Sequence, residues 1–258
     1  MIGQLQTILD IAGQSLAVAF VVFLRIGAAM ALLPALGERQ VPVRVKLAIG
    51  LSLTAIVAPA VAREVAPLAS GLSGILTSMA SETISGLIIG IVLRLAVLAL
   101  EMAGAIAAQS MSLSQLFGAG GEPMPSVSHL LVAGGLALAL MLGLHVRLVE
   151  FIILSYSVLR PGIFPVAAAL KDLGVGQVSW AFALAFSLAA PFVIAALVYN
   201  VALGAINRAM PQLMVAFVGA PALTAGALLL LCIAAPIGLS IWADAFGAML
   251  SDPFGAPQ

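Results

Sequence analysis

The ionisable side chains that stand inside apolar sequence are the residues best placed to do chemistry in this chain. Arg94 and Glu101 lie seven residues apart, on one face of a helix but too far apart for the usual i,i+4 contact. Arg147 and Glu150 are three residues apart and can pair directly. A proton relay needs several carboxylates or histidines in register, and only Glu82 and Glu101 are placed in that way. We therefore interpret these charges as structural, each one paired, at the interface, or facing a charge on a partner subunit.

The two histidines do not predict a metal site. His129 and His145 are sixteen residues apart, which is about 24 Å along a continuous helix. No His-Glu-x-x-His motif or carboxylate cluster accompanies them. The glycines at 174–176 lack the third glycine and the preceding strand of a dinucleotide site, and no Gly-x-Ser-x-Gly motif is present. We expect no catalytic constellation, no cofactor and no metal.

The composition excludes an ordinary soluble domain. Of the 258 residues, 63% are hydrophobic and 8% are charged, with a mean hydropathy of +1.24, whereas soluble domains are about 25% charged. The formal net charge is zero and no basic run occurs, so nucleic-acid binding has no support. The single cysteine, Cys232, rules out an internal disulfide. The chain belongs in a bilayer or in a membrane-derived assembly.

Six apolar stretches predict an all-α membrane protein. None of them shows the ten-residue alternation of a membrane β-barrel, and a span needs about 20 residues. Pro221 and Pro236 are candidate break points that could divide the last stretch into two helices. We expect one membrane domain over 1–258. The stretches cover 11–36, 46–62, 72–108, 127–159, 178–206 and 212–250.

The distribution of basic residues conflicts with a simple six-pass bundle. The first loop is basic, which places it in the cytoplasm and the N-terminus outside. Alternation then places the 160–177 loop outside, although it holds Arg160 and Lys171. It places the 109–126 loop inside, although that loop has no Lys or Arg. Either the number of spans is odd, or some segments are half-spans that never cross.

Small residues predict close helix packing in the third stretch. Gly86 and Gly90 form a Gly-x-x-x-Gly pattern, and Ala103 and Gly104 continue it. Such spacing lets helix backbones approach closely where van der Waals contact drives association. We expect this face to pack against a partner helix.

The segment 109–126 combines flexible and apolar residues. It holds three glycines and two prolines, and it also carries the apolar side chains of Met111, Leu113, Leu116, Phe117 and Met124. One interpretation is an interfacial loop that rests these side chains on lipid. The other is a plug, because apolar constrictions gate pores by dewetting and methionine adapts to irregular closures.

The stretch 207–226 is poorly explained by general membrane chemistry. Asn207 and Arg208 stand inside apolar sequence, Pro211 follows, and a Gly-Ala-Pro break comes at 219–221. One interpretation is a polar turn between two membrane helices, with Arg208 at the interface. The other is a helix hairpin whose bend is held by a protein partner, which supplies the hydrogen bonds freed by proline.

This stretch resembles the signature of the FliR family, a flagellar protein of the type III export gate. Three further segments resemble that family: 24–53, 86–114 and 142–162. The chain departs from the family in two places. Before the central loop the family usually has Gln-Met-Gly, where this chain has Ser110 and Ser112 around Met111. After the Gly-x-Pro element the family often has a basic residue, where this chain has Ala222 and Leu223. The residues that carry the signature are Asn207, Arg208, Pro211, Gln212, Phe217, Gly219 and Pro221.

The resemblance implies a non-enzymatic subunit built from helical hairpins in an assembly with FliP and FliQ homologues. FlhB and FlhA homologues, unfolded flagellar export substrates and lipid would be further partners, in the flagellar basal body of the bacterial inner membrane. The loop would close the channel through Met111, Leu113, Leu116 and Phe117. We expect assembly and packing contacts from Gly86, Gly90, Arg94, Glu101, Asn207, Arg208, Pro211, Gln212, Gly219 and Pro221.

Two other functions stay open from the sequence. An injectisome gate subunit is barely separable from a flagellar one by sequence. A small-solute carrier would show paired broken helices in two halves, and the break at 219–221 has no convincing counterpart in the first half. An intramembrane enzyme lacks a catalytic constellation. Under the gate hypothesis, the chain should be unstable when it is expressed alone.

Overall fold

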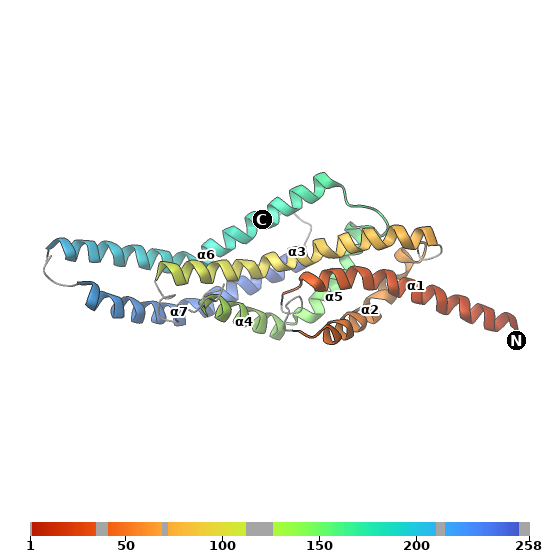
Figure 1. Ribbon diagram of the computed structural model, residues 1–258, viewed down its shortest axis with the longest axis horizontal. Coiled ribbons are helices and arrows are strands. Elements are labelled where there is room, and N and C mark those ends of the chain that lie inside the picture. The colour runs from red at the N-terminus through yellow and green to blue at the C-terminus, as the bar shows by residue number, and fades with distance from the viewer. Residues whose placement is uncertain (1, 35–40, 69–71, 112–125, 210–214, 253–258) are drawn as a thin grey trace. The chain divides into compact units, whose positions relative to one another are not determined.

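The computed structural model describes residues 2–34, 41–68, 72–111, 126–209 and 215–252. Within these ranges every regular element is an α-helix, which confirms the all-α prediction (Figure 1). The helices are α1 (Ile2–Leu32), α2 (Val43–Val65), α3 (Leu72–Ser110), α4 (Ser126–Met141), α5 (Leu144–Val158), α6 (Ala167–Ala209) and α7 (Val215–Ser251).

Five helices of the described part are long and apolar enough to cross a membrane, and the pair α4 and α5 would make six. The membrane assignment is therefore confirmed. At about 1.5 Å per residue, α3 with its 39 residues is about 58 Å long and α6 with its 43 residues is about 64 Å long. Both helices exceed the hydrocarbon core, which is about 30 Å thick.

The predicted stretch 127–159 is two helices rather than one. The chain bends by 79° between α4 and α5, and Gly143 there has a φ of +85°. Glycine adopts this left-handed conformation without the clash that a Cβ would introduce. The 24 Å separation expected for His129 and His145 on a continuous helix is therefore wrong. With 16 and 15 residues, neither helix alone reaches the roughly 20 residues of a span.

The two candidate break points of the last apolar stretch, Pro221 and Pro236, do not divide it. The helix α7 continues through both Pro221 and Pro236. Proline removes one helical hydrogen bond, but in apolar surroundings a break would expose several unpaired backbone groups, so a continuous helix is favoured. The helix α6 also begins at Ala167, eleven residues before the expected boundary at 178.

The chain forms two compact units that interleave along the sequence. Unit 1 comprises Met1–Leu95, Gly143–Gln177 and Met249–Gln258, and unit 2 comprises Ala96–Leu142 and Val178–Ala248. The helices α3 and α6 contribute residues to both units. A single domain over 1–258 stays a prediction.

Unit 1 is built around the first half of α3. The helix α1 packs on α2, and α2 also contacts α5. Figure 1 shows α1, α2 and α5 beside the orange part of α3. Each of these helices places branched or aromatic side chains in the core, which removes apolar surface from its surroundings and fills space at high density. Representative core residues are Val22, Ile26, Val57, Val61, Ile89, Leu93, Phe151 and Ile152.

Unit 2 packs α4, α7 and part of α6 on the second half of α3. Trp242 of α7 is fully buried, and its Nε1 donates a hydrogen bond to the carbonyl of Ala96 over 2.8 Å. Its ring stacks on Phe246 with the centroids 5.0 Å apart. Gly135 of α4 lies beneath the same ring, where a Cβ would come within 3.3 Å of it. The tryptophan thereby fixes the contact among three helices.

Candidate functional site

A buried ion pair connects α1 to α3 in unit 1. Arg25 Nε donates to Glu82 Oε2 over 2.7 Å, and Arg25 Nη2 donates to Glu82 Oε1 over 3.0 Å. Both side chains are completely buried. This two-point arrangement matches the guanidinium fork to the carboxylate and fixes the relative orientation of the two groups.

The same guanidinium also holds the end of α5. Arg25 Nη1 donates to Ser155 Oγ over 3.0 Å, and Nη2 donates to the carbonyl of Leu159 over 2.8 Å. The guanidinium carbon lies 3.7 Å from the ring centroid of Tyr156, within the range of cation–π attraction. We call Arg25, Glu82, Ser155, Tyr156 and Leu159 the polar junction.

The polar junction satisfies a charge that would otherwise be costly to bury. Four of the five N–H groups that an arginine offers are used in hydrogen bonds. Removing one partner of a buried pair typically costs about 3–5 kcal/mol, because it leaves an uncompensated charge. The arrangement therefore acts as a helix connector. It offers no open acid or base to a substrate.

Two glycines permit the close approach of α1 and α3. A Cβ on Gly86 would collide with the carbonyl oxygen of Arg25 and with Ala28, and a Cβ on Gly90 would come within 2.7 Å of the carbonyl oxygen of Ala29. The Gly-x-x-x-Gly pattern thus faces a helix of the same chain. This close approach brings the backbone of Arg25 to within side-chain reach of Glu82. An additional role of these glycines in contacts with other subunits stays a prediction.

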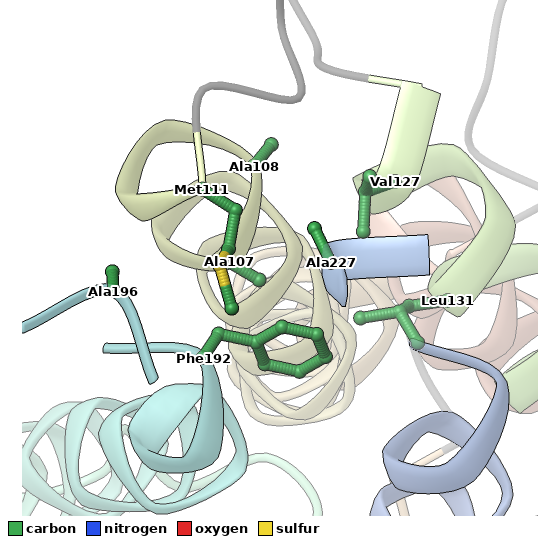
Figure 2. Packing of buried hydrophobic residues seen from close by; sticks show 8 residues of the cluster. All are labelled: Ala107, Ala108, Met111, Val127, Leu131, Phe192, Ala196 and Ala227. Carbon is green, nitrogen blue, oxygen red and sulfur yellow. The ribbon is translucent and has the colours of Figure 1, made fainter. Parts of the chain in front are cut away.

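Met111 lies in a buried apolar cluster of unit 2 at the end of α3. Figure 2 shows its side chain beside Phe192, with Ala107 close by. Met111 is 4% exposed. The other predicted plug residues, Leu113, Leu116 and Phe117, lie outside the described residues. We call the following set the Met111 cluster: Ala107, Ala108, Met111, Val127, Leu131, Phe192, Ala196 and Ala227.

The predicted charged residues of α3 differ in their surroundings. Arg94 is exposed, whereas Glu101 is half-buried and its carbonyl accepts a hydrogen bond from Ser128 over 2.9 Å. The sequence also suggested that Arg147 and Glu150 could pair. Among the described residues, Arg147 and Glu150 are exposed and form no ion pair, whereas Arg25 and Glu82 do.

The signature residues near the end of α6 are only partly described. Asn207 and Arg208 are exposed in its last turn. Pro211 and Gln212 lie outside the described residues. The backbone at 219–221 is helical, but the burial of Gly219 and Pro221 lies outside the description. The helix ends at Ala209, in line with the bias against helix just before a proline.

The described residues contain no group of three or more His, Cys, Asp or Glu that could hold a metal ion. Chemistry at the polar junction is limited to hydrogen bonding and charge pairing. What the site can do is hold α1, α3 and α5 in one geometry.

Comparisons with known proteins identify the kind of chain that carries these features. It matches the family described as bacterial export proteins, family 1, over residues 16–249. The flagellar biosynthetic protein FliR of Caulobacter vibrioides is 33% identical over 241 residues, which is 90% of this chain and 94% of that protein. The chain belongs to the FliR family.

Two further FliR-family proteins are similar over most of the chain. The FliR of Escherichia coli strain K12 is 30% identical over 77% of this chain and 76% of that protein. The FliR of Pectobacterium carotovorum is 29% identical over 87% of this chain and 88% of that protein. The FliR-family resemblance seen in the sequence is therefore confirmed.

Four of the five residues of the polar junction lie in segments that resemble the FliR family, but the sequence does not pair them. Arg25 lies in 24–53, and Ser155, Tyr156 and Leu159 lie in 142–162. Glu82 lies outside these segments and stands out in the sequence as a relay candidate. One available signal was that Arg25 and Glu82 carry opposite charges and both stand inside apolar stretches. Two such charges are stabilised when the fold brings them together.

Proposed function

We propose that this chain is a non-enzymatic subunit of the flagellar type III protein export gate. It would form, with FliP and FliQ homologues, the channel through which unfolded flagellar proteins leave the cell. The observation that carries this proposal is the match to flagellar FliR proteins along nearly the whole chain. The proposed location is the bacterial inner membrane at the flagellar basal body, with FlhA and FlhB homologues as neighbours.

The length of the apolar helices supports assembly with other subunits. The helices α3 and α6 are strongly apolar over much of their length, with mean hydropathies of 2.3 and 2.4 in their most apolar windows. Because each is about twice as long as the hydrocarbon core is thick, part of each helix extends beyond the lipid tails. Apolar surface in that region requires protein cover to avoid contact with water. Neighbouring subunits of the gate would supply it.

The helix α7 has even more apolar surface that requires cover by lipid or by other subunits. In the window taken from Ala225–Ser251, only 11% of the residues are buried inside the chain. Ile233, Ile237 and Ile241 form an exposed row with four-residue spacing, each more than half exposed. Such a row lies along one side of a helix. We propose that lipid covers part of this surface and other gate subunits cover the rest.

We further propose that the segment after α3 closes the channel. Met111 in the Met111 cluster fixes the start of this segment against α4, α6 and α7. A plug needs such an anchor, because a loop tied at its base loses less conformational freedom when it occupies the pore. Leu113, Leu116 and Phe117 would supply the apolar closure, which excludes ions by dewetting.

The test of the gate proposal is co-purification. The chain is expressed with and without its FliP and FliQ homologues, and the detergent-solubilised product is weighed by native mass spectrometry. A large complex that contains this chain supports the proposal. A stable monomer or homodimer that does not bind the homologues contradicts the gate proposal and favours a carrier. Restoration of motility in a mutant that lacks flagellar FliR separates the flagellar gate from an injectisome gate.

The plug proposal makes a separate prediction. Deletion of 112–121, which spares Met111, should leave the yield of the complex unchanged and make the closed gate leak ions. The measurement is the membrane conductance of cells or of reconstituted vesicles. The matched control shortens the chain at 253–258. If the loop deletion removes the complex, or leaves a complex that does not leak, the plug proposal is wrong.

A further inference from the structure

One face of α3 in unit 1 is exposed over four helical turns. Its residues alternate at spacings of four and three, while the opposite side of the helix is buried against the core of unit 1. This is the heptad spacing by which one helix packs along another. We call the exposed residues the Arg94 seam: Ala80, Ile84, Leu87, Ile91 and Arg94.

The apolar members of the Arg94 seam are large side chains with substantial exposure. Ile84 and Leu87 are each 37% exposed, and Ile91 is 49% exposed. On an adjacent side of the same turns, Gly86 and Gly90 allow α3 to pack closely against α1, and Glu82, on the side opposite the seam, is fixed in the polar junction. The helix is therefore unable to rotate and bury the seam within unit 1.

Arg94 gives the seam a chemical signature. Among the residues that the structure describes, Arg94 has no ion pair and no hydrogen bond. It lies 22 residues after the start of α3 and 16 residues before its end, which is about 33 Å and 24 Å along the axis. Neither end of the helix is within reach of its side chain. An arginine at the centre of a span costs roughly 2.5–3.5 kcal/mol on insertion scales, and an opposite charge removes that cost.

We propose that the Arg94 seam binds a helix of another gate subunit that places an Asp or Glu carboxylate against Arg94. This inference rests on the proposed function and extends it to the residues of one contact. The partner helix is apolar with heptad spacing, because Ile84, Leu87 and Ile91 have to be covered by knobs at matching positions. Its acidic residue lies toward the end of the seam and sets the register of the contact.

A second copy of this chain fits the seam less well. A parallel copy packed through the same seam would place Arg94 against Arg94, and like charges destabilise such a contact. Lipid alone would cover the apolar residues but leaves the guanidinium unpaired in the middle of α3. A carboxylate on a partner helix satisfies both requirements.

The test compares charge variants in the full chain expressed together with its FliP and FliQ homologues. Arg94→Gln should lower the yield of the complex at least tenfold, and Arg94→Lys, which keeps the charge, should lower it less. Arg147→Gln is the matched control, because Arg147 is an exposed arginine on α5 without a partner in the described residues. The amount of each variant in the membrane is measured without the homologues, so that loss of folding is separated from loss of assembly.

A cross-link then identifies the partner. A photoreactive phenylalanine analogue at Ile91 should capture a subunit of the complex at a helix that carries an Asp or Glu. Arg94→Glu should abolish the complex, and exchange of that acid for Arg should restore it. Capture of this same chain, or Arg94→Gln complexes within twofold of the unmodified yield, would overturn the proposal. Failure of the unmodified chain to form any complex would instead contradict the proposed function.

Discussion

The polar junction and the Met111 cluster connect helices by opposite means. In the junction, one guanidinium makes four directional hydrogen bonds that converge from two other helices. In the Met111 cluster, residues of α3, α4, α6 and α7 meet through apolar contact alone (Figure 2). Hydrogen bonds to a charge specify one arrangement, whereas a flexible thioether tolerates several. The polar junction therefore fixes one arrangement of its helices in unit 1, whereas the contacts of the Met111 cluster leave room for local adjustment beside the proposed plug.

The largest effect should follow from Glu82→Ala. Loss of the carboxylate leaves Arg25 buried without its counter-charge, which should lower the free energy of unfolding by about 3–5 kcal/mol. The measurement is thermal or denaturant unfolding in detergent, together with the amount of chain in the membrane. Glu150→Ala, at an exposed position of α5, is the control and should change little. The double change Arg25→Met with Glu82→Leu should be less harmful than Glu82→Ala alone.

A somewhat smaller effect should follow from Met111→Ala. Removal of a buried methionine side chain leaves a cavity beside Phe192, and such changes typically cost about 2–5 kcal/mol. Met111→Leu keeps most of the volume and should cost less than about 1.5 kcal/mol. The unfolding measurement for Glu82→Ala also serves here. If Met111→Ala left stability unchanged but the gate leaked, Met111 would act in the channel and its packing role would be secondary.

The smallest of the three effects should follow from Gly86→Ala. The added methyl group meets the carbonyl oxygen of Arg25, so α1 and α3 have to separate, at about 1–3 kcal/mol. Gly174→Ala is the matched control, because a Cβ at that helical position of α6 meets open space, and alanine favours helix by about 1 kcal/mol. Destabilisation by Gly86→Ala beside a neutral or stabilising Gly174→Ala is the expected pair of results.

Local sequence predicted the elements better than it predicted their partners. Long apolar runs were sufficient to place both ends of α2 and α3, and the C-terminal end of α1, to within a few residues. Each such run needs a helix to pair its backbone groups. The break at Gly143 was missed, because a glycine inside an apolar run also occurs within continuous helices, as Gly86 and Gly90 show. The opposite error arose at Pro236, where a strong breaker lies inside α7.

The candidate site was harder to predict than the elements. The contacts of Arg25 join residues 57, 130 and 134 positions apart, and no periodicity within one helix reports such a distance. Family resemblance placed Arg25 and Ser155 in known segments but gave no geometry. The Gly-x-x-x-Gly pattern predicted close packing, but it did not indicate that the neighbouring helix would be α1.

The spacing of the polar junction along the chain has a consequence for biogenesis. Leu159 lies 134 residues after Arg25, and Glu82 lies 57 residues after it. At translation rates of about 5–20 residues per second, Glu82 emerges roughly 3–11 s after Arg25 and Leu159 roughly 7–27 s after it. During that time α1 carries an arginine without its final partners. A chaperone or insertase that shelters α1 until α5 has been synthesised would prevent misinsertion, and a ribosome stalled before residue 155 should leave α1 and α2 accessible to proteases.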